Sequence, residues 1–316
     1  MKDEEIRYSV VVPVYNSEET LNILYDRIVN TLEVYKKHFE IIFVDDGSID
    51  NSWEKIRMIS MGDKRVSGIQ LMRNFGQANA TICGLRHSEG KWVITIDDDL
   101  QNPPEEISKL IDTMENNPAL DVVIGKPIDK KQALWRTLGS DLLNYISSYI
   151  FTKGNVIKLT SFRIITRSVV EHLLRIQAPH LATGASLCSI TSRIQNITVK
   201  HEHRMSGESG YSLSKLYRLS LSKFLSYSTF PLRFLAIAGI IGIFSSVVLG
   251  MFYFYRYLSG GIGVAGWTTL VLLMVGLAGF NFFAFGIIGE YLLRIMQSVY
   301  GMPQYQIRQY IAKNKK

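Results

Sequence analysis

The sequence predicts an α/β domain with a mostly parallel sheet, followed by two helices that span a membrane. Over the first two thirds of the 316 residues, short apolar runs alternate with segments of helical periodicity. Several of these runs end in acidic residues, and the chain after Phe230 carries long stretches without charge. Together these features indicate a ligand-binding domain attached to a membrane.

The short apolar runs predict the strands of the sheet. Val10, Val11 and Val12 stand together in the first run, and a run without polar alternation is typical of a strand buried on both faces. Proline or aspartate follows the first, second and fourth runs. The predicted strands are Arg7–Pro13, Glu40–Val44, Val66–Met72, Trp92–Ile96, Leu120–Ile124, Thr160–Arg167 and Ile194–His201.

Between the strands, apolar residues recur at the spacing of amphipathic helices. After the first strand, Leu21, Leu24 and Ile28 share one helical face, and Asn16 with Glu19 predicts a capping-box start. The predicted helices are residues 21–35, 77–87, 104–116, 135–151 and 169–176, with a further start near Ser52. Alternating strands and helices of this kind form nucleotide-binding α/β units.

Three consecutive carboxylates, Asp97 to Asp99, end the fourth strand, where open α/β sheets bind their ligands. Asp97 and Asp99 point to the same side of an extended chain, so they can share one hard divalent cation. Two prolines then open a helix. The alternative interpretation is that Asp99 or Asn102 caps this helix.

Asp45 and Asp46 follow the second strand, where they can hold a base or a ribose. No Gly-x-Gly-x-x-Gly follows the first strand, and no Walker-type phosphate loop is present. A metal ion that bridges a pyrophosphate would stabilise it as a leaving group. These observations favour a metal-bound nucleotide diphosphate over one held by a glycine-rich loop.

Two uncharged stretches, Leu235 to Tyr255 and Thr268 to Gly289, reach the roughly 20 residues that cross a bilayer. Buried core helices are the alternative. Lys and Arg flank both stretches, which places both flanks and the N-terminal domain in the cytoplasm. The predicted divisions are a catalytic domain at 1–210, an interfacial amphipathic helix and linker at 211–231, two transmembrane helices within 232–294 (about 235–255 and 268–289) and a basic cytoplasmic tail at 295–316.

Composition agrees with a reduced compartment at a membrane surface. No signal peptide is expected, and the two cysteines lie far apart in the sequence. Much of the net charge of +7 comes from basic residues near the membrane segments, which favours anionic lipid over nucleic acid as the partner.

For Tyr211 to Ser228, the alternative to a helix in the membrane interface is an amphipathic helix packed on the domain. Gly239, Gly242 and Gly250 would allow close packing of helices, so a homo-oligomer is a hypothesis.

If a nucleotide diphosphate is the leaving group of a transfer reaction, the acceptor of the transferred group would be a molecule in the membrane. Arg163, Arg167, Lys200 and Arg204 lie late in the domain and could grip a lipid phosphate. A phosphomonoester with a second pKa of about 6 is largely dianionic at neutral pH and is already a nucleophile. Such a reaction needs no general base.

Five motifs together resemble one enzyme family. They are Val11-Val12-Pro13-Val14-Tyr15-Asn16, Val44-Asp45-Asp46-Gly47-Ser48, Arg73-Asn74-Phe75-Gly76, the run from Asp97 to Pro104, and Gly207-Glu208-Ser209. The chain is similar to family 2 glycosyltransferases of GT-A fold. Within them it most resembles the polyprenyl-phosphate glycosyltransferases, including dolichol-phosphate mannose synthase, bactoprenol glucosyltransferases and undecaprenyl-phosphate aminoarabinose-type transferases.

The resemblance implies an inverting transfer of a sugar from a nucleotide-sugar to a polyprenyl phosphate, serving cell-envelope glycan or lipid modification at the bacterial inner membrane. A uridine donor and an undecaprenyl acceptor are favoured. The resemblance also implies roles for individual residues: Asp97, Asp99 and Gln101 with Mg²⁺ or Mn²⁺, Asp97, Asp99 and Arg163 in catalysis, Pro13, Tyr15, Glu18 and Asp46 with the nucleotide, and Arg163, Arg204 and Ser209 with the acceptor phosphate.

Three positions depart from the family pattern. Many relatives have Asp where this chain has Ser161, lysine where it has Gly210, and a smaller residue where it has Asp98. Asp98 should point away from the metal and support the site indirectly. The rival hypotheses are a membrane scaffold with a degenerate transferase domain and a transferase with another lipid or glycan acceptor. The identity of the sugar is not predicted.

Overall fold

The computed structural model describes residues 6–127, 157–176, 183–202, 267–299 and 303–312, with isolated positions between 241 and 259. The chain divides into two compact units. The first comprises Met1–Tyr211 with Pro303–Lys316, and the second comprises Ser212–Met302. The predicted helices at 135–151 and 211–228, and the predicted acceptor residues Arg204 and Ser209, lie outside the described residues.

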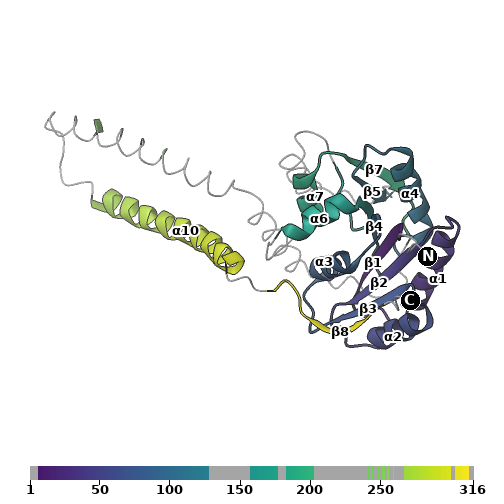
Figure 1. Ribbon diagram of the computed structural model, residues 1–316. Helices are drawn as coiled ribbons and strands as arrows, with labels where there is room; N and C mark the ends of the chain where they lie inside the picture. The colour runs from purple at the N-terminus through teal and green to yellow at the C-terminus, as the bar shows by residue number, and fades with distance from the viewer. Residues whose placement is uncertain are drawn as a thin grey trace. The chain divides into compact units, whose positions relative to one another are not determined.

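The first unit is built around an eight-stranded sheet with the strand order β7-β5-β6-β4-β1-β2-β3-β8 (Figure 1). Strand β1 is central and pairs in parallel with β2 and β4, while β6 and β8 run against their neighbours. The strands are β1 (Tyr8–Val14), β2 (Phe39–Asp45), β3 (Val66–Leu71), β4 (Trp92–Thr95), β5 (Val122–Pro127), β6 (Arg163–Thr166), β7 (Ile194–Val199) and β8 (Ile307–Ile311).

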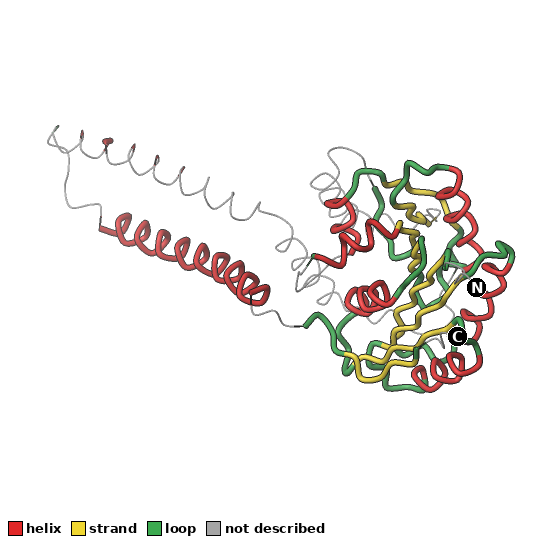
Figure 2. Tube along the Cα trace, in the orientation of Figure 1, coloured by secondary structure: helices red, strands yellow, loops and turns green. Residues whose placement is uncertain are grey.

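Helices cover both faces of this sheet (Figure 2), as continuous apolar strands require. Alternate residues of β1 enter two separate cores: Val10 and Val12 face one, and Val11 faces the other. The described helices of this unit are α1 (Leu21–Glu33), α2 (Ser52–Gly62), α3 (Gln77–His87), η1 (Pro104–Glu106), α4 (Ile107–Asn116), α6 (Arg167–Arg175) and α7 (Thr183–Ile190).

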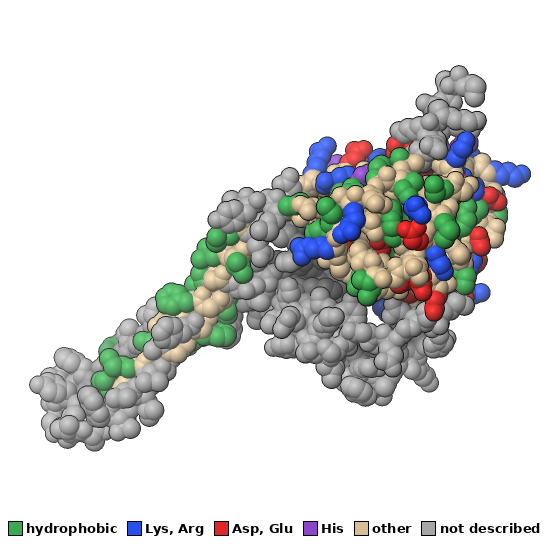
Figure 3. Space-filling view, turned by 90° about the horizontal axis from the view of Figure 1, so that it is seen from below, with side chains coloured by type: hydrophobic (Ala, Val, Ile, Leu, Met, Phe, Trp, Pro, Cys, Tyr) green, Lys and Arg blue, Asp and Glu red, His purple; other side chains and the backbone are tan. Residues whose placement is uncertain are grey.

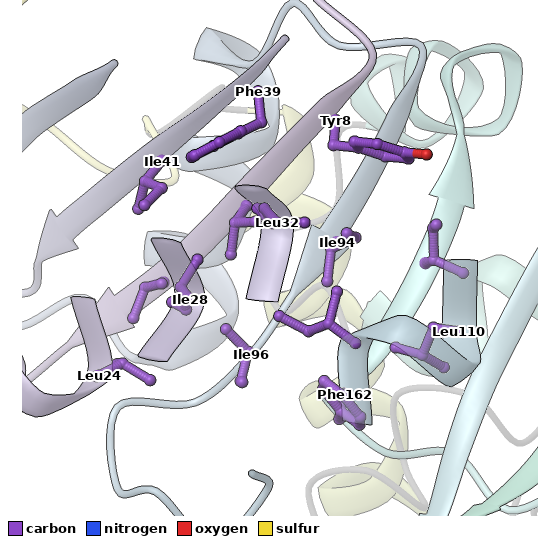
Figure 4. Close-up of a cluster of buried hydrophobic side chains, with 14 of the residues drawn as sticks. Tyr8, Leu24, Ile28, Leu32, Phe39, Ile41, Ile94, Ile96, Leu110 and Phe162 are labelled. Carbon is purple, nitrogen blue, oxygen red and sulfur yellow. The ribbon is translucent and has the colours of Figure 1, made fainter. Parts of the chain in front are cut away.

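The core on the α1 side contains the largest buried side chains. Leu24, Ile28 and Leu32 project from α1 onto Ile94 and the neighbouring strands (Figure 4). Residues of α2 and α4 complete this core. The opposite core combines the sheet with α3, α6 and α7. This double layer fixes the sheet, so the loops at the carboxyl ends of the parallel strands are held on a rigid frame.

The second unit contains α10 (Trp267–Val299), which includes the second predicted span. Many of its described hydrophobic side chains are exposed, among them Leu273, Met274 and Phe285. Figure 3 shows hydrophobic side chains, in green, on the surface of the described helix. Nowhere in the described chain is a helix long and apolar enough to cross a membrane. The first predicted span is described only at isolated positions. The membrane hairpin therefore stays a prediction.

The structure differs from the sequence prediction at three elements. The capping box is wrong: Thr20 precedes α1 without a side-chain cap, and Asn16 instead accepts a hydrogen bond from Ile49 N at 2.9 Å. Helix α7 was not predicted. Strand β8 lies in the segment predicted as a basic tail, and it pairs with the edge of β3.

Candidate active site

Four loops meet at the carboxyl edge of the parallel strands. The register pairs Val14 of β1 with Asp45 of β2, and Val11 with Thr95 of β4. The segments that follow these strands, and the turn after β3, therefore leave the sheet at one edge. The first two segments join directly, since Asp46 N donates to the carbonyl oxygen of Val14 at 2.8 Å.

Asp97 is held by two side chains from different elements. Its Oδ1 accepts a hydrogen bond from Gln77 Nε2 of α3, and its Oδ2 accepts one from Ser161 Oγ, both at 2.5 Å. Burial raises the pKa of Asp97; the Ser161 bond lowers it, the charge of Asp99 raises it and the charge of Arg163 lowers it. The carboxylate is thus fixed in orientation beside one negative and one positive group.

Asp99 belongs to a turn whose backbone conformation is unusual. Its Oδ1 accepts a hydrogen bond from Gln101 N at 3.1 Å, and Leu100 between them has φ of 60°. The carbonyl oxygen of Gln101 accepts bonds from His201 Nδ1 and Glu202 N, both at 2.8 Å. The turn is therefore anchored to the residues that follow β7, and His201 has a structural role there.

The helix-capping alternative is not supported. Pro103 precedes η1 and Glu106 precedes α4, and neither helix start has a side-chain cap. The Asp99 carboxylate bonds to Gln101 within its own turn. The acidic residues thus stand before the helix without capping it.

The pair Asp97 and Asp99 fits a divalent metal. Asp97 and Asp99 are two positions apart in the segment that follows β4, and the charge of Asp99 acts to raise the pKa of Asp97. A bound cation would relieve that repulsion. Within the described residues, no group of three His, Cys, Asp or Glu side chains forms a metal site. Mg²⁺ is commonly held by one or two carboxylates together with substrate phosphates. The donor set suits a metal shared with a diphosphate.

Asp98, between the two, faces the segment that follows β1. Its Oδ2 accepts hydrogen bonds from Tyr15 N at 2.9 Å and from Ser17 Oγ at 2.5 Å. Burial raises the pKa of Asp98 to about 6, although both bonds act to lower it. The Asp98 side chain is thus hydrogen-bonded to the loop that follows β1.

The predicted nucleotide residues occupy three different environments. Pro13 is buried within β1, whereas Tyr15 is 46% exposed at the edge. Glu18 accepts a hydrogen bond from Asn51 N at 2.9 Å, which ties the segment after β1 to the start of α2. Tyr15 and Glu18 are placed where a ligand at this edge can reach them.

Asp46 is buried, and both its oxygens are engaged. Phe75 N donates to Oδ1 at 2.7 Å, and Gly76 N donates to Oδ2 at 2.8 Å. Burial raises the pKa of Asp46 to about 6 against the opposing effect of these bonds. In this structure Asp46 holds the turn after β3, whose Gly76 has φ of 92°.

Arg163 lies on β6, where it pairs with Thr95, and it is 2% exposed. Burial lowers its pKa to about 10, and the charge of Asp97 raises it. A Cβ added at Gly184 in α7 would lie 3.7 Å from Arg163 Nη1, so the guanidinium reaches the first turn of α7. The structure brings Arg163 together with Asp97 but does not describe Arg204 and Ser209.

Sequence reasoning missed two residues that contact the site. Gln77 and Ser161 both donate to Asp97, but neither was assigned a role there. Gln77 opens a helix directly after the Arg73–Gly76 motif, which is the signal that could have indicated it. The position of Ser161 could not be inferred, because β6 pairs with β4 but follows it in the sequence by more than 65 positions, after α4 and β5.

The comparisons with known proteins agree with one another. The family described as glycosyl transferase family 2 matches residues 9–174. An undecaprenyl-phosphate 4-deoxy-4-formamido-L-arabinose transferase of Photorhabdus laumondii is 32% identical over 100% of this chain and 98% of its own length. The transferase of the same name from Proteus mirabilis is 32% identical over 98% of this chain and 95% of its length.

One solved structure shows the shared α/β fold. It is the glucosyl-3-phosphoglycerate synthase of Mycobacterium tuberculosis in complex with Mn²⁺, uridine diphosphate and phosphoglyceric acid. That protein is 18% identical to this chain, with a TM-score of 0.50 over 70% of this chain and 76% of its own. The likeness supports a GT-A-like, mostly parallel sheet.

Proposed function

The chain belongs to glycosyltransferase family 2, and on that premise we propose that it transfers a sugar from a UDP-linked donor to undecaprenyl phosphate. The transfer depends on Mg²⁺ or Mn²⁺ and inverts the anomeric carbon. It takes place on the cytoplasmic face of the bacterial inner membrane. Membership of the family makes the chain an enzyme, a glycosyltransferase; donor, acceptor, metal and location are the proposal.

The observation that carries the proposal is the pair Asp97 and Asp99 at the end of β4, on an edge where the loops after β1 and β2 also converge. Two similarities to known proteins support the choice of substrates. Transferases that match this chain over nearly its whole length are named for undecaprenyl phosphate. A protein of similar fold was crystallised with Mn²⁺ and uridine diphosphate.

Asp97 and Asp99, with Gln101, would hold the metal. When bound, the metal neutralises charge on the diphosphate and so improves it as a leaving group. Gln77 and Ser161 fix the Asp97 carboxylate before any ligand arrives. The edge is therefore organised in advance, which lowers the reorganisation needed during the reaction.

Arg163 supplies a buried positive charge beside Asp97. In the proposed reaction it attracts the acceptor phosphate, together with Arg204 and Ser209 from the segment after residue 202. A phosphomonoester with a second pKa of about 6 attacks as a dianion, so no side chain has to remove a proton. One direct displacement inverts the anomeric carbon, through an oxocarbenium-like transition state.

The test is a transfer assay with radiolabelled UDP- and GDP-sugars on detergent-solubilised protein that has been purified away from the lipids of its membrane. UDP-4-deoxy-4-formamido-L-arabinose is the first donor to offer, because the relatives are named for that sugar. Each donor is paired with undecaprenyl phosphate or with undecaprenol, which lacks the phosphate. We expect lipid-extractable label from a UDP-sugar only with the phosphorylated lipid. Equal label with undecaprenol, or label only in a non-lipid product, would point to the alternative acceptor.

A further inference from the structure

Asp98 joins the acidic turn to the segment that follows β1. Its Oδ2 accepts hydrogen bonds from Tyr15 N and Ser17 Oγ, at 2.9 and 2.5 Å. Its carbonyl oxygen accepts a third bond from Thr20 Oγ1 at 2.7 Å. Asp98 therefore accepts three hydrogen bonds from the segment 15–20, including both of its ends, which lies more than 75 positions earlier in the chain.

The same segment is also held by the loop after β2 and by the first residue of α2. Asn16 N donates to Ser48 Oγ at 3.0 Å, and Ser17 N donates to Ser52 Oγ at 2.9 Å. Asn16 has φ of 52°, in the left-handed region that Asn tolerates better than most residues. The segment is thus shaped by two sets of contacts, and Asp98 provides those from the acidic turn.

We propose that Asp98 is a positioning residue for the donor nucleotide. It fixes the Tyr15–Glu18 segment against the turn that carries Asp97 and Asp99, so that the nucleotide and metal parts of the site keep one relative geometry. The inference rests on the proposed function, in which Tyr15 and Glu18 hold the nucleotide. Hydrogen bonds to a carboxylate are stronger than neutral ones, so a single side chain suffices for this task.

The physical benefit is preorganisation. A loop that is ordered before the ligand arrives loses less conformational freedom on binding, and the ligand binds more tightly for the same contacts. Without the Asp98 carboxylate, the Tyr15 amide and the Ser17 hydroxyl lose their bonds to the acidic turn, although Ser48 and Ser52 still hold Asn16 and Ser17. The nucleotide would then have to complete the ordering of the segment. The metal ligands on either side would keep their own supports, Gln77, Ser161 and the Gln101 amide. Loss of Asp98 should therefore weaken nucleotide binding without weakening metal binding.

The experiment uses the full chain in detergent, with Asp98→Ala, Asp98→Asn and the control Asp112→Ala. Asp112 lies exposed on α4, where its carboxylate bonds to Tyr35 OH. Mn²⁺ binding without nucleotide is measured from the electron paramagnetic resonance of free Mn²⁺, and UDP binding is measured by calorimetry at saturating Mn²⁺. Hydrogen exchange of the peptide covering residues 15–20 reports the loop directly.

For Asp98→Ala we expect the Kd of UDP to rise roughly tenfold, the effect of losing hydrogen bonds to a charged group. The Kd of Mn²⁺ should stay within about twofold, and exchange of the Tyr15 amide should accelerate at least about tenfold. Asp98→Asn keeps an oxygen acceptor and should restore much of the UDP affinity. Asp112→Ala should match the wild type in all three measurements.

Unchanged UDP affinity in Asp98→Ala would overturn the proposal, and so would loss of Mn²⁺ binding, which would make Asp98 a metal ligand. If Asp98→Ala does not fold, Ser17→Ala replaces it, because this variant removes one of the two hydrogen bonds to the Asp98 carboxylate. A smaller rise in the Kd of UDP is then the supporting result. If the wild type binds no UDP, the proposed donor is wrong. Exchange of the Tyr15 amide then decides whether Asp98 holds the segment.

Discussion

Leu100 and Asn16 hold left-handed backbone conformations, with φ of 60° and 52°. Both lie in loops at the edge where the candidate site is formed. Such conformations cost free energy and persist where surrounding contacts impose them, which is common at ligand-binding sites. Asn tolerates this region better than most residues, whereas Leu100 is kept there by burial at 1% exposure. Two of the three described non-glycine residues with positive φ therefore lie at this edge, and the third, Lys36, follows α1.

Asp46 should make stability depend on pH. Its pKa is raised to about 6 in the folded protein, so the folded state binds the proton more tightly than the unfolded state. The stabilisation is complete below the unfolded pKa, about 4, and is lost as the pH rises through about 6. The free energy of unfolding of the wild type, minus that of Asp46→Asn, should fall by about 2 kcal/mol between pH 4 and 7.

Urea unfolding followed by the fluorescence of the buried Trp53 and Trp92 measures this difference. Asp112→Asn on the exposed side of α4 provides the baseline for changing a carboxylate into an amide. A difference between wild type and Asp46→Asn that does not vary with pH would show that the amide bonds of Phe75 and Gly76 outweigh burial.

Ser161 should act through Asp97. Its hydroxyl donates to Asp97 Oδ2, so Ser161→Ala frees that oxygen to rotate away from a metal. Removing such a supporting hydrogen bond typically lowers metal affinity about tenfold or more. Mn²⁺ binding by electron paramagnetic resonance should show this loss for Ser161→Ala. Ser108→Ala, which removes a helix-surface hydroxyl on α4, should bind Mn²⁺ as the wild type does.

At the scale of elements, α3 sits close to the centre of the sheet because Gly84 has no side chain. A Cβ at Gly84 would collide with Val11 of β1 and come within 3.2 Å of Val44 of β2. Gly84→Ala should therefore lower the free energy of unfolding by about 1–3 kcal/mol, the usual cost of overpacking.

Gly62 provides the matched comparison. It ends α2, and nothing lies within 4 Å of a Cβ added there. Gly62→Ala should be neutral or stabilising by up to about 1 kcal/mol, because alanine favours the helix. Urea unfolding of the two variants tests the packing of α3, and equal stabilities would contradict it.

The strands that were predicted from continuous apolar runs are confirmed at β1 to β4, since burial on both faces leaves a strong signal. Helix α7 was missed because Thr183, Gly184 and Ser186 are weak helix formers, and packing of the buried Leu187 stabilises it instead. The capping box failed because Asn16 bonds to the loop after β2, a contact between distant residues. Local sequence patterns carry no information about such contacts.

In the candidate site, likewise, some residues could be predicted from the sequence and others could not. Asp97 and Asp99 could be proposed from their place after a strand, because strand ends in a parallel sheet share one edge. The contacts of Asp97 with Gln77 and Ser161 depend on the order of strands, which the sequence does not state. Strand β8 was missed for a related reason: Ile307–Ile311 is a short edge strand among basic residues, and its pairing with β3 spans more than 230 positions.

At the scale of the whole molecule, the chain returns to the first unit after α10 and completes its sheet. Met72 N donates to the carbonyl oxygen of Gln306 at 2.8 Å, and Arg308 Nη2 donates to that of Met72 at 2.9 Å. Trp53 Nε1 donates to Gln309 at 3.2 Å. The last residues therefore cover an edge of β3 that would otherwise expose unpaired backbone groups.

Ending the chain after Met302 should lower the free energy of unfolding by at least about 2 kcal/mol, since each lost hydrogen bond contributes about 1 kcal/mol. Thermal unfolding and light scattering of the solubilised protein measure the loss and the aggregation that an open edge promotes. Gln309→Ala, which removes only the Trp53 bond, should have a much smaller effect. A truncated chain as stable as the full one would show that β8 does not support the sheet.

The most direct measurement of the central claim is the amount of lipid-extractable label formed from a UDP-sugar and undecaprenyl phosphate by the wild type, Asp99→Asn and the surface control Asp112→Asn. Label that requires Mg²⁺ or Mn²⁺, disappears with EDTA and with Asp99→Asn, and persists with Asp112→Asn is the predicted result. Transfer that continues in Asp99→Asn, or that is indifferent to the metal, would contradict the assignment of this edge as a metal-dependent glycosyltransferase site.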